Sequence, residues 1–539
     1  MELKTGAHAL AASLFLAAAV APAHAGRPYR FGNAAPITDL GDRRSIPVPR
    51  MRAAEVRGGE YVFDTLVRYP PVGLSETWRI PRAGDVNSLD DVPASSWFTP
   101  RLGNRELSPD ELLKGQAITG GPKLPLRVEQ VFPGAEGGLL AMDASGHHWF
   151  VDFDPRGHRG LQTTAGVLAN RIFWAYGLNV PEDHVVEVRP DDLTVPAADE
   201  ATRAALDSLL SLAAMPVEGR LRARASRRLE GIVLGPFSPR GVRIDDPNDR
   251  VPHENRRTLR ALRVLGAWVN LQEIRPANTL DVYEGSPGRG FVRHCFLDLG
   301  EAFGGYAASS RRYWSGYNHN FSVKDALLNF ATAGLFVGHW EDETQTAWPS
   351  VGTFEARRFD PAGWRETSAF PPIRRSRPED DYWAAVRLAA FQPAHVEALV
   401  RSVGFPDPGA AEYMVSTLLE RRRKLVEWAF ARVTPLDALG ISGSHLRLKD
   451  RGRAFGSAAS AQYSVTLFDG KGRSLQTLTL RAEGDDAVVP LPRLAAGSPD
   501  AYLRVEVLVV RDGRSAPRPA EFHLRPSWDG EWRLVGVVH

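Results

Sequence analysis

The chain has 539 residues, of which 43% are apolar and 24% are charged, and its formal net charge is only +2. This composition excludes a disordered chain, and the length is sufficient for two or more globular domains. Because the net charge is small, no global field attracts nucleic acid, and we expect no nucleic-acid partner.

The first 25 residues have the pattern of a secretory signal peptide. One lysine precedes the apolar run ALAASLFLAAAVA, and Ala23 and Ala25 flank His24 as in an A-x-A cleavage site. No later stretch reaches the roughly 20 apolar residues that a spanning helix needs. We therefore expect an exported protein, periplasmic or extracellular, without a membrane span. Cys295 is the only cysteine, which excludes an intramolecular disulfide.

Residues 26–125 are rich in Pro, Gly and Arg and contain short apolar runs such as YVFDTLVRYPP. This pattern predicts an extended N-terminal segment that wraps the next domain. From residue 126 to 195 the pattern changes to short apolar strands, with one helix over TAGVLANRIFWAYGL that stops at Gly177. The expected strands are LPLRVEQVF, GGLLAMD, HHWFVDFD and DHVVEVRP. These elements predict a small β-rich lobe.

Residues 196–435 have mostly helical periodicity. The predicted helices cover PHENRRTLRALRVLGAWVN, EDDYWAAVRLAAF and AAEYMVSTLLERRRKLVEWAFARV. The basic run RLRARASRR, Arg220 to Arg228, lacks aromatic residues, and we interpret it as a solvated helix face in preference to a phosphate-binding stretch. An α-rich lobe is expected here.

Residues 436–539 alternate apolar and polar side chains again. QYSVTLFDGKGRSLQTLTL predicts two strands around a turn at Asp469 to Gly472, and YLRVEVLVVRDGR and WRLVGVV follow the same period. The spacing predicts a separate antiparallel β-sandwich. The predicted fold class of the whole chain is therefore α+β.

Two stretches of the α-rich lobe contain the candidate functional residues. VNLQEIRPANTLDVY is a polar loop before a strand, and FLDLGEAFGG is an apolar strand that ends in Asp298, Leu299 and Gly300. Together with DDPNDRVPHENRRTLRALRVLGAWVN and YGLNVPEDHVV, they resemble a group of bacterial secreted proteins with an atypical kinase fold. That fold is similar to those of HipA-type kinases, CotH-type kinases and the phosphatidylinositol 3-kinase group, and the resemblance covers roughly residues 90–435.

The resemblance implies a two-lobed protein-kinase-like domain over residues 126–435, divided into 126–195 and 196–435, which binds ATP with Mg²⁺ or Mn²⁺. Phosphoryl transfer needs metal ions on the phosphates, a cation, and a carboxylate that orients the acceptor. Asp298 and Asn278 match the metal-binding positions of the pattern. The alternative is that Asn278 caps a turn and Asp298 pairs with an arginine.

Three positions depart from the kinase pattern. Glu273 stands where related sequences carry the catalytic Asp, and its extra methylene displaces the carboxylate. Asp152 stands where the phosphate-binding Lys is expected, and Gly166 stands where the acidic partner of that Lys is expected. The joint loss of cation and partner predicts an impaired site. Gly137 and Gly138 could bring backbone N–H groups to a phosphate, although Gly pairs between strands are more often hairpin turns.

Two functions follow from these residues. The first is an exported kinase-like protein without phosphoryl transfer, which acts as a binding or scaffold module for a protein or envelope partner. The second is a metal-dependent phosphotransferase in which Glu273 orients the acceptor, Asn278 and Asp298 hold the metal, and an arginine replaces the missing lysine. An arginine in the cleft near Asp152 would favour the second.

Overall fold

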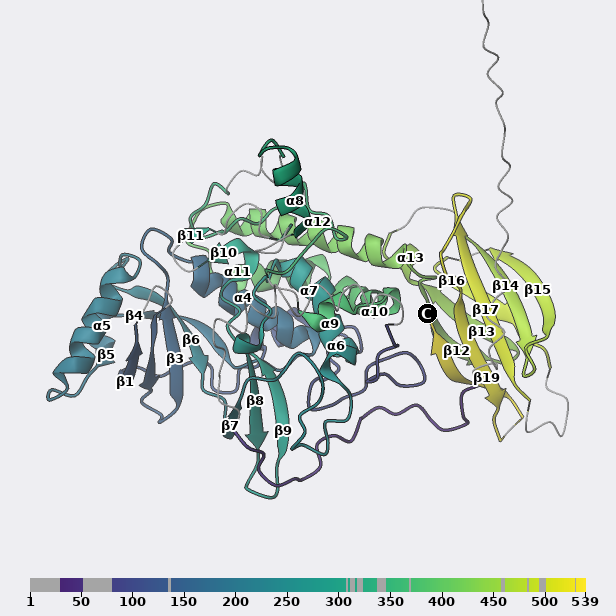
Figure 1. Cartoon of the computed structure of the whole chain (residues 1–539), viewed down its shortest axis with the longest axis horizontal. Coiled ribbons are helices and arrows are strands. Elements are labelled where there is room, and N and C mark those ends of the chain that lie inside the picture. Colours follow the sequence, from purple (N-terminus) through teal and green to yellow (C-terminus); the bar gives the residue numbers. More distant parts are fainter. Residues whose placement is uncertain are drawn as a thin grey trace, which may run out of the picture.

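The computed structural model describes residues 30–51, 80–133, 137–306, 309–310, 316–317, 323–336, 346–367, 370–456, 461–481, 484–493, 501–528 and 530–539. The predicted signal peptide and the run at residues 61–71 lie outside these ranges. The fold is mixed α+β: a six-stranded sheet at one end, a helical block in the centre and antiparallel sheets at the other end (Figure 1). Within the described ranges, no helix has the length and apolar character that crossing a membrane requires.

The six-stranded sheet has the order β4-β6-β3-β2-β1-β5, antiparallel except for the parallel pair β1 and β5. Helix α5 (Glu200–Leu212) packs Leu206 and Leu209 into the core on one face of the sheet. Helix α4 (Leu161–Tyr176) packs against β4 and β6 and ends at Gly177, as predicted. The strands are β1 (Leu126–Phe132), β2 (Gly138–Met142), β3 (His148–Phe153), β4 (Asp183–Val188), β5 (Leu193–Thr194) and β6 (Leu221–Arg227). The predicted strands at β1 to β4 are confirmed.

Strand β6 corrects the interpretation of the basic run Arg220 to Arg228. Leu221, Ala223 and Ala225 are buried in the core of the sheet, while Arg222 and Arg224 lie on the opposite face. The helix prediction was wrong because it weighed the charge of the run and not its period of two, which is typical of a strand. The sheet therefore takes a strand from beyond residue 195.

The central block contains the predicted helices. The helix expected over Pro252 to Asn270 is divided at Ala261 into α6 (Arg257–Arg260) and α7 (Leu262–Val269), and its apolar side chains are buried in the central core. The other helices of the block are α3 (Pro109–Lys114), α8 (Val323–Ala331), α9 (Pro371–Arg374), α10 (Pro378–Ala389), α11 (Pro393–Ser402) and α12 (Ala410–Phe430). Short 3₁₀ turns occur at η2 (Pro190–Asp192), η3 (His253–Asn255), η4 (Pro276–Asn278) and η5 (Ala302–Gly304).

A three-stranded antiparallel sheet, in the order β7-β8-β9, adjoins this block (Figure 1). Its strands are β7 (Ile232–Gly235), β8 (Thr279–Glu284) and β9 (Phe291–Phe296), and a small pair β10 (Gly305–Tyr306) and β11 (Ser309–Ser310) follows. The described part of the N-terminal segment contacts this sheet through a bridge from Ile46 to Gly290. The segment also places Trp97, Phe98 and Leu112 in the central core. It therefore contributes to the packing of the helical block in addition to running along its surface.

After α12, two antiparallel sheets enclose one apolar core, which is the two-sheet arrangement predicted for this part of the chain. One sheet contains β12 (Leu436–Ser442), β13 (His445–Asp450) and β16 (Asp486–Pro490). The other contains β14 (Ala461–Asp469), β15 (Ser474–Arg481), β17 (Leu503–Arg511), β18 (Arg514–Ser515), β19 (Ala520–Pro526) and β20 (Trp532–Val538). The short helix α13 (Arg451–Ala454) connects β13 to β14.

Candidate functional site

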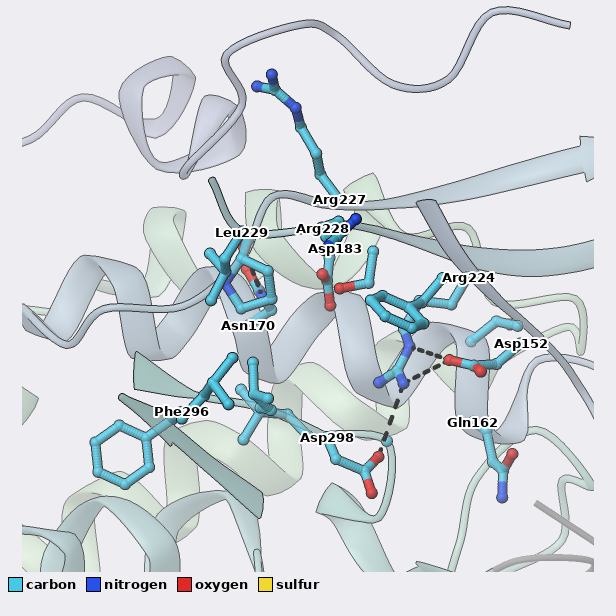
Figure 2. A pocket seen from close by; sticks show the side chains of 18 of the residues that line it. Asp152, Gln162, Asn170, Asp183, Arg224, Arg227, Arg228, Leu229, Phe296 and Asp298 are labelled. Atoms are coloured by element: carbon cyan, nitrogen blue, oxygen red, sulfur yellow. Dashed lines mark hydrogen bonds and ion pairs between the residues drawn. The ribbon is translucent and has the colours of Figure 1, made fainter. Parts of the chain in front are cut away.

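A cavity of about 480 Å³ lies between the six-stranded sheet and the turn that follows β9. Strands β3, β4 and β6 form one wall, helix α4 another, and residues 296–301 the third. Figure 2 shows the labelled side chains Asp152, Asp183, Arg224 and Asp298 directed toward one another in this space. The cavity therefore combines charged groups from the sheet with the predicted metal residue Asp298.

Arg224 is the central cation of the cavity. Its Nη2 and Nε donate to Asp152 Oδ2 at 2.6 and 3.1 Å, and its Nη2 lies 3.7 Å from Asp298 Oδ1 (Figure 2). The pairing of β3 with β6 places Asp152 and Arg224 opposite each other. Burial by itself would lower the pKa of Arg224, but Asp152, Asp183 and Asp298 outweigh it and raise that pKa. The arginine is thus ionised and anchored between the sheet and the turn.

The position of Arg224 also explains the glycine in α4. A Cβ atom at Gly166 would lie 2.7 Å from Arg224 Cδ and Nη1, so only glycine leaves the guanidinium its space. The interpretation that Asp152 and Gly166 mark the loss of a lysine and its acidic partner stays a prediction, and the structure adds a cation from elsewhere in the sheet. The cation comes from the neighbouring strand β6, Asp152 is its partner, and Gly166 makes room for it.

Asp298 lies at the start of the turn after β9. The Leu297 N–H donates to the Asn278 carbonyl at 2.9 Å, which continues the contact between β9 and β8. Asp298 has a φ of +51°, a left-handed conformation, and its side chain is 51% exposed in the cavity wall. Partial burial raises the pKa of Asp298; Arg224 opposes this, and Asp152 and Glu273 add to it.

Asn278 and Glu273 lie beside Asp298 but are held by local contacts. The Asn278 amide donates to the Glu273 carbonyl at 3.1 Å, and the Asn278 Oδ1 accepts from Arg275 Nε at 3.4 Å. The Glu273 carboxylate pairs with Arg275 Nη2 at 2.6 Å. All four side chains line a second cavity of about 10 Å³, which shares residues 296–299 with the larger one. The structure therefore brings Glu273, Asn278 and Asp298 together.

These residues fit a metal ion only in part. Within the described ranges, no group of three or more His, Cys, Asp or Glu side chains converges as a metal site. Asp298 supplies an open carboxylate, whereas the Asn278 oxygen already accepts a hydrogen bond from Arg275. Mg²⁺ commonly takes one or two protein carboxylates together with substrate phosphates and water. The site therefore fits such an ion only with oxygen ligands from a bound phosphate compound.

Gly138 is the first residue of β2 and Gly137 precedes it, and neither is among the described residues that line the larger cavity. Gly138 stands opposite Asp152 in the sheet, and a Cβ at Gly138 would overlap Asp152 Oδ1. Gly138 thus permits the position of the Asp152 carboxylate. Residues 134–136, which precede this glycine pair, lie outside the described residues.

Arg224 and Asp183 are charged residues of the cavity that were not among the predicted site residues. Arg224 could have been found from the alternation of small or apolar residues with Arg in LRARAS, which predicts a strand with arginines on one face. Asp183 begins a predicted strand, and its sequence context carries no signal of a cavity. No family model matches this chain, and no curated protein matches it.

The space that Gly166 leaves for Arg224 gives a stability prediction with an unusual sign. In a helix interior, Ala is normally more stabilising than Gly by about 1 kcal/mol. Gly166→Ala is instead expected to lower the free energy of unfolding by about 1–2 kcal/mol, because the new methyl displaces a paired, mostly buried guanidinium. Chemical denaturation measures this.

The control is the same substitution in an Arg224→Ala background, where no guanidinium has to move. There, Gly166→Ala should stabilise by about 1 kcal/mol. Equal effects of Gly166→Ala in both backgrounds would show that the position of the Arg224 side chain does not depend on a glycine at residue 166.

Proposed function

We propose that this chain is an exported, kinase-like binding module whose cavity takes a phosphate-bearing ligand of the nucleotide class, with phosphoryl transfer impaired. The observation that carries the proposal is Arg224, a cation held inside the cavity between Asp152 and Asp298. A guanidinium binds phosphate oxygens through a planar fork of donors. Arg224 therefore supplies the phosphate-binding cation that the pattern lacks at Asp152.

The arrangement of the cavity walls supports a two-lobed domain. The six-stranded sheet and α4 form one side, and the loop and strands from Glu273 to Asp298 form the other. The chain passes from β6 to β7 along the cavity, and Arg228, Leu229 and Val233 line it there. A ligand in this position would contact both sides at once, as in a kinase cleft.

The impairment is proposed from the surroundings of Glu273. Phosphoryl transfer needs a carboxylate that orients the acceptor hydroxyl and accepts its proton. The Glu273 carboxylate is 11% exposed and pairs with Arg275 at 2.6 Å, so an acceptor would compete with an internal cation for it. Its longer side chain also places the carboxylate differently from an aspartate, and small displacements lower rates strongly.

A second candidate function is a metal-dependent phosphotransferase. The observation that favours it is again Arg224, because an arginine near Asp152 supplies the cation that transfer requires, and Asp298 opens into the same cavity. A bound Mg²⁺ or Mn²⁺ would neutralise phosphate charge, with Asp298 and Asn278 as its protein ligands. Glu273 would orient the acceptor hydroxyl.

The proposed partner is a protein or envelope component that contacts the C-terminal sheets. These sheets have an apolar core of their own, separate from the core of the helical block. They are thus the part of the chain that can carry a docking surface without changing the cavity. Export to the periplasm or the exterior is proposed from residues 1–25, as in the sequence prediction.

Binding is tested by thermal unfolding of residues 26–539 with ATP, in the presence and absence of Mg²⁺ or Mn²⁺. A ligand that binds only the native state stabilises it by about 2.7 kcal/mol at 100 times its Kd. We expect a metal-dependent rise in Tm with ATP that Asp298→Ala removes, because the metal then loses its open protein carboxylate.

Asp207→Ala is the matched control, since Asp207 is exposed on α5 and is not among the described residues that line the cavity. No rise in Tm at millimolar ATP would contradict the binding proposal. Transfer of label from ATP that disappears in Glu273→Gln would favour the phosphotransferase over the binding module.

A further inference from the structure

Asp183 is a cavity residue whose hydrogen bonding is incomplete. It begins β4, and its carboxyl faces the cavity near Arg224 and Asn170 (Figure 2). Ser226 stands opposite Asp183 in the sheet, and its side chain lowers the pKa of this carboxyl. Its Oδ1 is shielded from solvent and has no hydrogen-bond partner within the described part of the chain. A buried acceptor without a donor is costly, and most such atoms in folded proteins have a partner.

The cavity has two chemically different ends, and Asp183 lies between them. Asp152, Arg224 and Asp298 form the charged end (Figure 2). Leu229 and Phe296 supply apolar surface on the other side of Asp183 (Figure 2), and Val233 and Leu280 are further apolar residues of the cavity lining. A ligand that fills the cavity therefore carries an anionic group and an apolar ring, and the part that joins them passes the Asp183 carboxyl.

We infer that Asp183 is a specificity-determining residue: its Oδ1 accepts a hydrogen bond from an N–H or O–H group on the ring or sugar of the ligand. This inference rests on the proposed function and adds the residue that recognises the nucleoside part of the ligand. The ligand is a phosphorylated nucleoside, because a nucleotide combines a phosphate, an apolar ring face and hydrogen-bond donors between them. Inorganic phosphate compounds would bind at the charged end of the cavity and would not need the Asp183 acceptor.

The charge of Asp183 gives the inference a second consequence. Asp183 is an anion near Arg224, so its removal strengthens the attraction of Arg224 for phosphate. It also removes the acceptor for the nucleoside. Asp183→Ala should therefore weaken the binding of a nucleotide while leaving the binding of pyrophosphate unchanged or tighter. A merely structural role for Asp183 would change both affinities in the same direction.

The experiment is titration calorimetry of residues 26–539 with pyrophosphate, ADP, purine riboside 5′-diphosphate, 2′-deoxy-ADP and 3′-deoxy-ADP, all with Mg²⁺. The three analogues each lack one donor: the base amine or one of the two ribose hydroxyls. We expect one analogue to bind at least about tenfold more weakly than ADP, as for a lost hydrogen bond to a charged group. Asp183→Ala should lower ADP affinity to the level of that analogue.

Glu187→Gln is the matched control, because Glu187 lies on the same strand and pairs with Arg159. Asp183→Asn is the second variant: it removes the charge and keeps an acceptor oxygen, so its loss of ADP affinity should lie between wild type and Asp183→Ala. Equal binding of ADP and all analogues, or equal losses for ADP and pyrophosphate in Asp183→Ala, would overturn the inference and leave the proposed function intact. Absence of binding for every phosphate compound would overturn both.

Folding of the variants is checked by thermal unfolding between pH 4 and pH 8. Burial raises the pKa of Asp183 to about 6, with Asp152 contributing, against an ordinary value of 3.8. The native state therefore holds this proton more tightly than the unfolded chain, so the contribution of Asp183 to stability falls as pH rises from about 4 to about 6. Asp183→Asn has no carboxyl that titrates at this position. The Tm of this variant minus the Tm of wild type should therefore increase as pH rises.

Discussion

Arg224→Gln is expected to lower the free energy of unfolding by about 2–4 kcal/mol at pH 7. Breaking a fully buried ion pair by removing one partner costs roughly 3–5 kcal/mol. Arg224 is 12% exposed but Asp152 is 30% exposed, so solvent compensates part of the loss. The substitution leaves Asp152, Asp183 and Asp298 facing one another without their shared cation. Chemical denaturation at fixed ionic strength measures the difference.

The difference in the free energy of unfolding between wild type and Arg224→Gln should depend on pH. Arg224 lowers the pKa of Asp183 and of Asp298 in the wild type, so its removal raises both pKa values. In the variant, the native state then binds more protons than the unfolded chain at pH values between about 4 and 7. The variant therefore recovers stability as pH falls, and the gap to wild type narrows below pH 6.

Two further variants make this result specific. Arg220→Gln changes an exposed arginine of the same basic run and should alter stability by less than about 0.5 kcal/mol. Asp152→Asn combined with Arg224→Gln removes an uncompensated carboxylate and should recover part of the loss. It should not restore phosphate binding. A pH-independent loss in Arg224→Gln would show that the charges of the cavity are not coupled through this arginine.

Asp380→Asn is expected to destabilise the protein by about 3–5 kcal/mol. Asp380 is fully buried at the start of α10 and accepts from Arg257 Nε at 2.9 Å and from Arg260 Nη1 at 3.1 Å. Arg257 also donates to Asp90 in the N-terminal segment, at 2.8 Å. The substitution leaves two buried guanidiniums with one fewer negative charge, at the point where the segment joins α6 and α10.

Thermal and chemical unfolding measure this loss. Glu412→Gln is the matched control, because its pair with Arg401 is 3.5 Å long and both side chains are more than half exposed. Exposed pairs contribute at most about 1 kcal/mol, so this variant should be close to wild type. A loss below about 1 kcal/mol in Asp380→Asn would show that the two arginines find other partners.

Much of the secondary structure was predictable from local patterns. Helices α4, α7, α10 and α12 and the strands β1 to β4 occur where apolar residues recur with the period of a helix or strand. The position of Asp298 at the end of an apolar strand and its proximity to Asn278 and Glu273 were predicted as well. These residues are separated by a short strand pair, so a local pattern is enough to place them together.

The charge balance of the cavity was not predictable in the same way. Asp152 and Arg224 are 72 positions apart, and only the pairing of β3 with β6 places them opposite each other. The prediction therefore found an anion where a cation was expected and concluded that the cation was lost. The role of Gly166 was not predictable either, because this glycine of α4 leaves space for the Arg224 side chain of strand β6.

The sequence by itself determined most of the helices and strands and the apolar side of each strand, with β6 as an exception, because these properties depend on neighbours a few positions away. The tertiary structure alone decided which strands pair, and with that which charges share the cavity. Ion pairs and hydrogen bonds act over a few ångströms in space, whatever the separation along the chain. For this reason only the folded protein shows that Arg224 and Asp183, on which the proposed ligand recognition depends, line the same cavity.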